Sequence, residues 1–135
     1  MREVKFKVWD KTASRMGLVT GIDYFHELSG NLLYRLFYYD IEDDVEDWSN
    51  HAITGDEGIL LQFTGLKDKN GVDIYEGYIV IQSPGFGCEW SDRKAVVVYN
   101  YASFWVEWDG AGTILDDHDC NFEVIGNIYE NPELL

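Results

Sequence analysis

QFTGLKDKNGVDIYEGYIVI, residues 62–81, is the stretch that decides the fold. An Asn70-Gly71 pair follows Asp68 there, and Asn-Gly tolerates the positive φ angles of a tight turn. This is the strongest short-range signal for a β-hairpin. The pattern predicts one strand over residues 60–63 and its antiparallel partner over residues 72–75.

Toward the C-terminus, further strand patterns follow. Gly77 interrupts the outgoing strand, where an isolated glycine typically marks a bulge or a close backbone approach. Residues 95–99 are β-branched and residues 104–108 are aromatic, so the two runs predict a second hairpin. A last strand is expected over residues 122–128. Asn131-Pro132 then predicts a short terminal turn of helix, with Asn as its cap and Pro in its first position.

Toward the N-terminus, the pattern is also that of strands. Apolar and charged residues alternate over residues 2–9, and residues 18–24 repeat the alternation, as expected for two antiparallel strands. Residues 32–39 also fit a helical stripe, but their Tyr and Phe content favours a strand. The acidic run from Asp40 to Trp48 predicts a short helix.

The fold class that follows is mainly β with one or two short helices. We expect a β-rich N-terminal part over residues 1–57 and a second part over residues 58–135, with one compact unit as the alternative. The acidic stretch from Asp40 to Glu57 is the expected joint between the two.

The composition limits the classes of function. The chain has 135 residues, of which 46% are hydrophobic and 16% aromatic, enough for the core of a β-rich protein. Lys and Arg number 10 against 25 Asp and Glu, so the net charge of −15 argues against binding to nucleic acid or to an anionic membrane. A basic protein partner fits this charge better, and solubility alone would also explain it.

The two cysteines and the chain's start bear on its location. Cys88 and Cys120 are too few for a disulfide framework, so we expect free thiols. No apolar segment follows Met1, and no apolar run approaches the ~20 residues of a membrane span. We therefore expect a soluble cytoplasmic protein.

Three separated blocks carry a family resemblance. Residues 1–10, MREVKFKVWD, residues 63–80, FTGLKDKNGVDIYEGYIV, and residues 122–135, FEVIGNIYENPELL, together resemble the YopX family of phage and prophage proteins. The resemblance implies an SH3-like barrel in the C-terminal portion, packed against the N-terminal part. It implies no established activity and no catalytic residue. The chain departs from the family's EGD pattern at Glu76-Gly77-Tyr78, so an acidic role there has no support.

Aromatic residues are the candidate interaction surface. Trp90, Tyr101, Trp105 and Trp108 would line an exposed groove for a peptide, as in many SH3-like barrels. The competing interpretation is that these side chains fill a small core. Alternation places Trp105 and Glu107 on one face of their strand, opposite Phe104, Val106 and Trp108.

One cluster of metal-capable side chains remains, Asp116 to Cys120, in which Asp117, His118 and Asp119 are the central residues. Neighbouring residues on an extended segment cannot all face one ion, so a solvated acidic turn is the favoured interpretation. The sequence carries no calcium loop, no complete nucleotide-binding glycine motif and no nucleophile–base motif. We expect no cofactor, no metal site and no catalytic residue.

Three hypotheses for function stay open. The first is a non-enzymatic protein-interaction module that docks on a host or phage protein. The second is a small metal-dependent hydrolase that uses residues 116–119. The third is an acidic mimic of DNA. Strands with large apolar side chains on both faces also predict a homo-oligomer.

Overall fold

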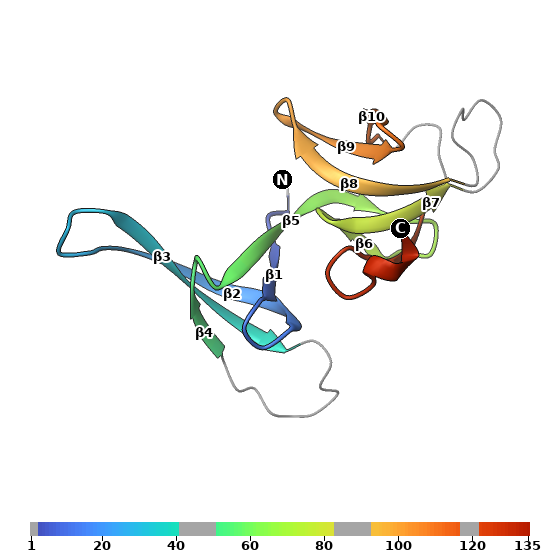
Figure 1. Cartoon of the computed structure of the whole chain (residues 1–135). Helices are drawn as coiled ribbons and strands as arrows, with labels where there is room; N and C mark the ends of the chain where they lie inside the picture. The colour runs from blue at the N-terminus through green and yellow to red at the C-terminus, as the bar shows by residue number, and fades with distance from the viewer. Residues whose placement is uncertain (1–2, 41–50, 83–92, 117–121) are drawn as a thin grey trace. The chain divides into compact units, whose positions relative to one another are not determined.

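The computed structural model describes residues 3–40, 51–82, 93–116 and 122–135 (Figure 1). These residues form antiparallel strands and one short turn of 3-10 helix, which confirms the mainly β class. The strands are β1 (Phe6–Asp10), β2 (Arg15–His26), β3 (Leu32–Asp40), β4 (His51–Thr54), β5 (Gly58–Lys67), β6 (Asp73–Tyr75), β7 (Tyr78–Gln82), β8 (Lys94–Asn100), β9 (Ser103–Trp108), β10 (Ala111–Ile114) and β11 (Phe122–Asn127), and the helical turn is η1 (Pro132–Leu134).

The strands form two sheets. One has the order β4-β3-β2-β1-β5-β6 and the other the order β10-β9-β8-β7-β11. Most neighbours in the sheets are also neighbours in the sequence and pair antiparallel, as short hairpin connections require. No strand pairing joins β10 to β11 within the described residues, so the second sheet is open rather than a closed barrel.

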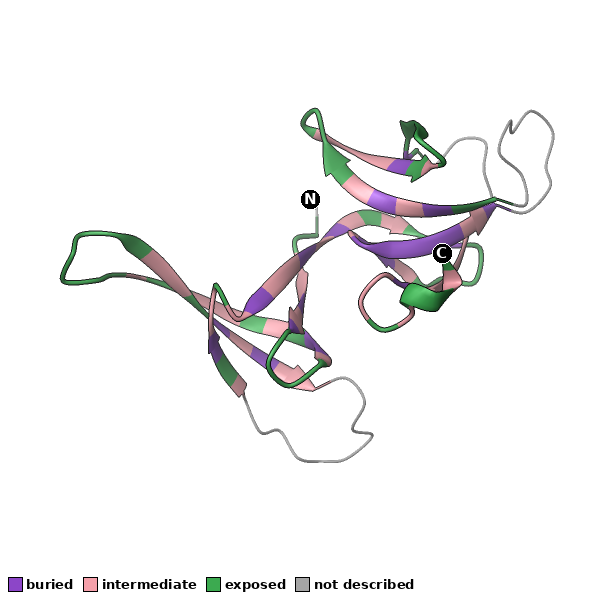
Figure 2. Cartoon of the chain, in the orientation of Figure 1, coloured by how far each residue is buried: buried purple, intermediate pink, exposed green. Residues whose placement is uncertain are grey.

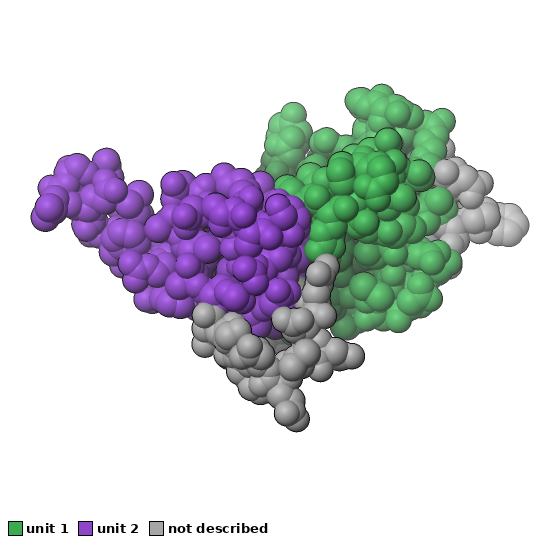
Figure 3. Space-filling view, turned by 60° about the horizontal axis from the view of Figure 1, so that its bottom comes forward, with its two compact units in different colours: residues 1–4, 63–135 green, residues 5–62 purple. Residues whose placement is uncertain are grey.

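The chain divides into two compact units, which Figure 3 colours separately. One unit contains residues 5–62 and the other contains residues 1–4 and 63–135. The boundary falls inside β5, because this strand pairs with β1 in its first half and with β6 in its second half. The expected division into an N-terminal part at residues 1–57 and a second part at residues 58–135 stays a prediction.

One core cluster of the unit at residues 5–62 comes from strands β1, β3 and β4. Val8, Leu36, Tyr38 and Ile53 are its buried members. Val8 falls on the inward side of the alternation read from the sequence, which is why β1 forms a half-buried strand. Gly17 of β2 lies directly against the ring of Tyr38, and a Cβ placed there would come within 2.0 Å of it.

The core of the other unit is centred on β7 (Figure 2). Tyr78, Ile79 and Val80 are all buried, so both faces of this strand are covered. β7 lies between β8 and β11 in its sheet, and a central strand covered on both faces reads as a continuous apolar run in the sequence. The run YIVI at residues 78–81 is that signal.

Most local predictions are confirmed. The hairpin of β5 and β6 turns at Gly71, whose φ is 81°, and the hairpin of β8 and β9 lies where the β-branched and aromatic runs placed it. Residues 32–39 form a strand, not a helix. Gly77 lies between β6 and β7 with φ 76°, and its N–H donates to the Val97 carbonyl at 2.8 Å, so the close backbone approach is correct and the bulge is not.

The terminal helical turn is present, whereas the helix expected at residues 40–48 falls largely on residues that the structure does not describe. Pro132 begins η1 as expected, but the Asn131 side chain does not cap it. Its Oδ1 instead accepts from the N–H of Asn127, at 3.2 Å. The helix expected at residues 40–48 lies outside the described residues, except for Asp40, which ends β3.

Candidate functional site

One face of β8, β9 and β10 carries the candidate site. Val98 lies opposite Trp105 in the β8–β9 ladder, and Glu107 lies opposite Gly112 in the β9–β10 ladder. Directly opposed residues share a face of a sheet, so these side chains point the same way. The other face holds the buried residue Val106, which makes this face the outer one.

A groove of about 500 Å³ lies on this outer face. Its lining comes from β8, β9, the two adjoining turns and the start of β10: Val96, Val98, Tyr101, Trp105, Glu107, Trp108 and residues 109–112. The floor is therefore apolar and aromatic. The small residues Ala111 and Gly112 keep side chains out of the groove on the β10 side.

Two tight turns bound the groove, and both require backbone angles that most residues avoid. Tyr101 and Ala102 connect β8 to β9 with φ of 48° and 59°, and Asp109 and Gly110 connect β9 to β10 with φ of 45° and 80°. Positive φ at both central residues is the pattern of a type I′ hairpin turn, whose twist matches that of the strands. Three of the four residues carry a Cβ, so the turns hold strain of about 1 kcal/mol per residue.

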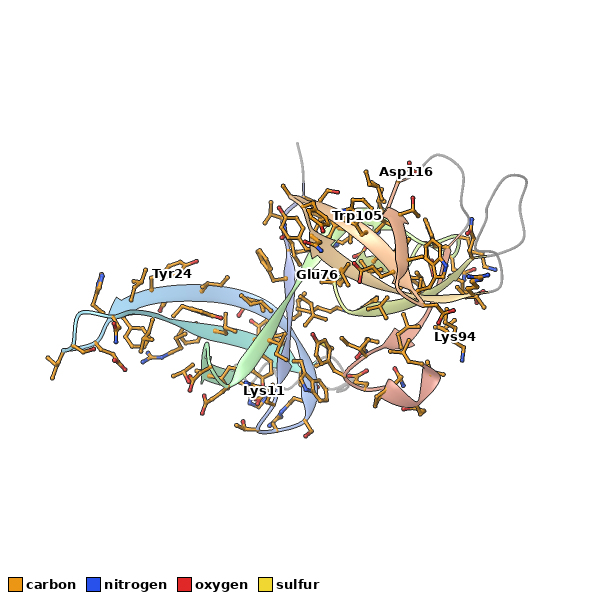
Figure 4. The ribbon with its side chains drawn as sticks, turned by 45° about the horizontal axis from the view of Figure 1, so that its top comes forward. Lys11, Tyr24, Glu76, Lys94, Trp105 and Asp116 are labelled. Atoms are coloured by element: carbon orange, nitrogen blue, oxygen red, sulfur yellow. The ribbon has the colours of Figure 1, made fainter. Side chains whose placement is uncertain are left out.

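The strained turn places Tyr101 beside Trp105. The two rings are 6.0 Å apart between centroids and inclined at 66°, an edge-to-face contact. Tyr101 is 82% exposed, so most of its ring meets solvent although it stands next to an apolar floor. Figure 4 labels Trp105 on this unit. Strain that presents an exposed aromatic ring is typical of a binding site.

Two buried polar atoms on β9 lack a hydrogen-bond partner within the part of the chain that the structure describes. They are Trp105 Nε1 and Ser103 Oγ, from residues on the groove face. Each such atom costs about 1–3 kcal/mol compared with a paired one. The face therefore retains hydrogen-bonding capacity that the described part of the chain leaves unused.

The charge at the groove is negative. Glu107 and Asp109 are exposed and belong to its lining. Lys94, at the start of β8, is directed elsewhere, since its Nζ donates to the Leu134 carbonyl at 2.7 Å (Figure 4). An aromatic floor with carboxylates attracts cations and repels anions.

The structure brings together three of the four residues expected to form an interaction surface. Tyr101, Trp105 and Trp108 line the same groove. Trp90 lies outside the described residues. The alternative, that these aromatic side chains fill a small core, does not hold for Tyr101, which is exposed. Trp105 and Trp108 are half-buried. Their binding role stays a prediction.

Asp109 and the valines of β8 were not among the expected site residues. Glu107 was placed on the Trp105 face by alternation but not assigned to the site. The signal that would have identified Asp109 is its position in the Asp-Gly pair at residues 109–110, a type I′ turn marker directly after the aromatic run.

The expected metal-capable cluster is described only at Asp116, which is exposed; residues 117–120 lie outside the described residues. Within the described ranges, no three His, Cys, Asp or Glu side chains gather as ion ligands would. The metal-dependent alternative thus gains no support from residues 3–40, 51–82, 93–116 and 122–135.

A second groove lies in the unit at residues 5–62. It has a volume of about 610 Å³ and is formed by the β2–β3 hairpin and the turn after β4. Its lining includes Leu32, Tyr34, Thr54 and Asp56. Thr54 Oγ1 donates to Asp56 Oδ1 at 2.5 Å, and the Tyr34 hydroxyl donates to the Gly55 carbonyl at 3.4 Å. The Thr54 and Tyr34 hydroxyls are therefore both bonded to other residues of the groove's own lining.

Comparison with known proteins assigns the family. The model of the family described as YopX protein matches residues 5–135. The chain belongs to the YopX family. No curated protein matches this YopX-family sequence significantly.

The fold also resembles a solved structure. The crystal structure of protein EF1440 from Enterococcus faecalis is similar to this YopX-family chain with a TM-score of 0.59 and 26% identity. The match covers 100% of this chain and 99% of that one. Neither match brings an activity, a ligand or a partner with it. Within the described residues, no helix has the length and apolar character needed to cross a bilayer.

Proposed function

We propose that this YopX-family protein is a non-enzymatic protein-interaction module, a phage or prophage accessory protein that acts in the cytoplasm of the bacterial host. The observation that carries the proposal is the groove at Tyr101, Trp105 and Trp108, with Glu107 and Asp109 at its margin. One exposed ring, Tyr101, and two half-buried indoles offer a large contact area, and aromatic side chains lose little conformational entropy on binding.

The groove suits a protein segment better than a small substrate. It is shallow and lined by a sheet face, and it presents no nucleophile paired with a base. An SH3-like arrangement of the C-terminal strands is part of this proposal and would present such a face to a peptide. The net charge of −15 favours a basic partner.

Affinity capture from phage-infected cells with matched variants tests the proposal. Tyr101→Asn removes the exposed ring while placing a residue that tolerates positive φ in the turn. Tyr24→Ala is the control, because Tyr24 is 69% exposed on the β2–β3 hairpin of the other unit (Figure 4). A captured protein is then purified and its affinity is measured by calorimetry.

The expected result is a saturable partner that binds the wild type and Tyr24→Ala equally and Tyr101→Asn at least tenfold more weakly. Truncating an aromatic anchor typically costs about 2 kcal/mol or more of binding energy. The proposal would be overturned if the partner bound Tyr101→Asn as tightly as the wild type, or if no saturable partner were found.

A further inference from the structure

We propose that β10 accepts an extended segment of the partner as an added strand, and that the groove receives a lysine or arginine side chain of that segment. This rests on the proposed function and specifies its ligand. It concerns the free side of β10 and the groove residues Trp105, Glu107 and Asp109.

The first support is that β10 is an edge strand, with no other described strand paired to its outer side. It is the outermost strand of the sheet β10-β9-β8-β7-β11, and all four of its residues are exposed. Natural proteins block strand edges with charged side chains, proline or a bulge. The sequence of β10, Ala-Gly-Thr-Ile, has neither a charge nor a proline, and its pairing with β9 runs without a register shift.

The second support is the direction of the β10 backbone groups. The N–H of Leu115 donates to the Phe104 carbonyl at 2.9 Å, so these residues form a hydrogen-bonded pair. Such pairs alternate along an antiparallel ladder, which makes Thr113 a member of the next one. Gly112 and Ile114 therefore direct their N–H and C=O groups away from β9, at the spacing an added strand uses.

The opposite edge of the same sheet is closed, which marks β10 as different. The Val124 N–H of β11 donates to Asp68 Oδ2 at 3.0 Å, and the Phe122 carbonyl accepts from the Lys69 N–H at 2.9 Å. A register shift between Val124 and Gly126 further disrupts that edge. Among the residues that the structure describes, contacts thus block further pairing at β11, and none blocks it at β10.

The third support is the position of Gly112. In an added antiparallel strand, the residue opposite Gly112 would face the groove. Gly112 has no side chain, and a Cβ there would come within 3.2 Å of Glu107 Cγ. A long side chain from the added strand can therefore cross Gly112 and reach Glu107.

The chemistry of the groove selects a cation. Glu107 and Asp109 supply negative charge, and the Tyr101 ring and the Trp105 indole supply aromatic surface. Lysine and arginine combine an apolar stem, which packs on such a floor, with a charge attracted to carboxylates and aromatic faces. An acidic side chain would meet like charge.

The test uses the full chain and four synthetic peptides, acetyl-Ser-Thr-Val-Thr-Xaa-Thr-Val-Thr-Ser-amide, in which Xaa is arginine, lysine, glutamine or glutamate. Amide and indole NMR signals of the protein are followed during titration. The arginine and lysine peptides should shift the signals of Gly112, Ile114 and Trp105. The glutamine peptide should bind at least tenfold more weakly, and the glutamate peptide should not bind.

Two further experiments distinguish the contribution of the peptide's charge from that of its backbone pairing with β10. Glu107→Gln should weaken the arginine peptide about fivefold and leave the glutamine peptide unchanged, whereas Glu123→Gln, on the closed edge β11, should change neither. Two N-methylated peptides are compared, one methylated at odd-numbered and one at even-numbered residues. Only one of the two sets of amides pairs with β10, so one peptide should lose binding and the other should keep it.

The outcomes distinguish this inference from the proposed function. Equal binding of all four peptides, no effect of Glu107→Gln, or no binding at millimolar peptide would overturn the cationic added strand. The proposed function stands in that case if Tyr101→Asn still weakens the captured partner. If the arginine peptide binds at β10 but Tyr101→Asn leaves the affinity for the captured partner unchanged, the proposed function fails instead.

Discussion

The carboxylate of Asp68 accepts a hydrogen bond from the Val124 N–H at 3.0 Å, across 56 residues of sequence. Its other oxygen accepts from the N–H groups of Asn70 and Val72, at 2.8 and 2.9 Å. One side chain therefore closes the turn between β5 and β6 and also ties that turn to the last strand. Asp68 is 7% exposed, so these bonds replace water that the carboxylate has lost.

Asp68→Asn should lower the free energy of unfolding by about 2 kcal/mol at pH 7, because an amide nitrogen replaces one of the accepting oxygens and leaves a buried N–H unpaired. Urea denaturation measures the change. The control is Glu133→Gln, at an exposed position of the same unit, which should change stability by less than about 0.5 kcal/mol. Equal effects of the two variants would contradict the role given to Asp68.

The stability contributed by Asp68 should also depend on pH. Burial alone would raise the pKa of this carboxyl, but the three backbone N–H bonds outweigh it and hold the pKa below its ordinary value of 3.8. When the pKa of a carboxyl is lower in the folded than in the unfolded state, the folded state is stabilised at pH values above the unfolded pKa. That stabilisation is lost as the pH falls through the folded pKa. Between pH 7 and pH 3 the wild type should therefore lose more stability than Asp68→Asn. Parallel pH curves would rule this out.

Tyr38→Phe should destabilise the unit at residues 5–62 by about 1–3 kcal/mol, since the buried Tyr38 hydroxyl donates to Asp10 Oδ2 at 2.5 Å. Burial raises the pKa of Asp10, but hydrogen bonds from Tyr38, Thr12 and Ala13 lower it further than burial raises it. The pKa of Asp10, followed by NMR, should rise in the variant. Tyr34→Phe is the control, with a 3.4 Å bond to Gly55 and an expected loss below about 0.5 kcal/mol.

Ala102→Gly should stabilise the protein by about 0.5–1 kcal/mol, because Ala102 has φ 59° and glycine reaches that angle without a Cβ clash. Ala111→Gly, in strand β10 of the same unit, should instead cost about 0.5–1 kcal/mol through backbone entropy. Thermal or urea unfolding distinguishes the signs. A loss of stability in Ala102→Gly would show that its turn is not strained.

Gly17→Ala should cost about 1–3 kcal/mol, as expected for overpacking, because the new Cβ would come within 2.0 Å of the Tyr38 ring, which is fully buried. Gly21→Ala, in the same strand, brings its Cβ no closer than 3.5 Å to Phe37 and should change stability by less than about 1 kcal/mol. The ratio of the two losses in urea unfolding is the measurement. Equal losses would mean that strand propensity, and not the contact with the Tyr38 ring, determines the effect of substituting Gly17.

Self-association stays a prediction from the sequence, and the exposed apolar residues Tyr24, Leu28 and Leu32 of the β2–β3 hairpin support it. Copies with a net charge of −15 repel each other, so a homo-oligomer should tighten as salt screens the charge. Light scattering measures the molecular mass at 50 mM and 500 mM salt. Over this range the Debye length falls from about 14 Å to about 4 Å, so repulsion between the copies is screened. A monomer at both salt concentrations would refute the oligomer.

The sequence by itself determined where most strands and turns lie. The Asn70-Gly71 pair and the alternation around residues 6–9 and 95–108 act between neighbours in the chain, so their effect can be read directly from residue order, although the expected strand begins at Phe6 and not at residue 2. Three blocks at residues 1–10, 63–80 and 122–135 also identified the family, which the match over residues 5–135 confirms. The sequence likewise placed Trp105 and Glu107 on one face of their strand.

Only the tertiary structure decided which face of β9 is buried and what meets across the strands. Alternation says that Val106 and Trp105 point in opposite directions, but the inward direction depends on what packs against the sheet. The groove depends on the register that sets Val98 opposite Trp105 and Glu107 opposite Gly112. The Asp68–Val124 bond depends on pairing between distant segments, and such contacts are fixed by the packing of the whole unit rather than by neighbouring residues.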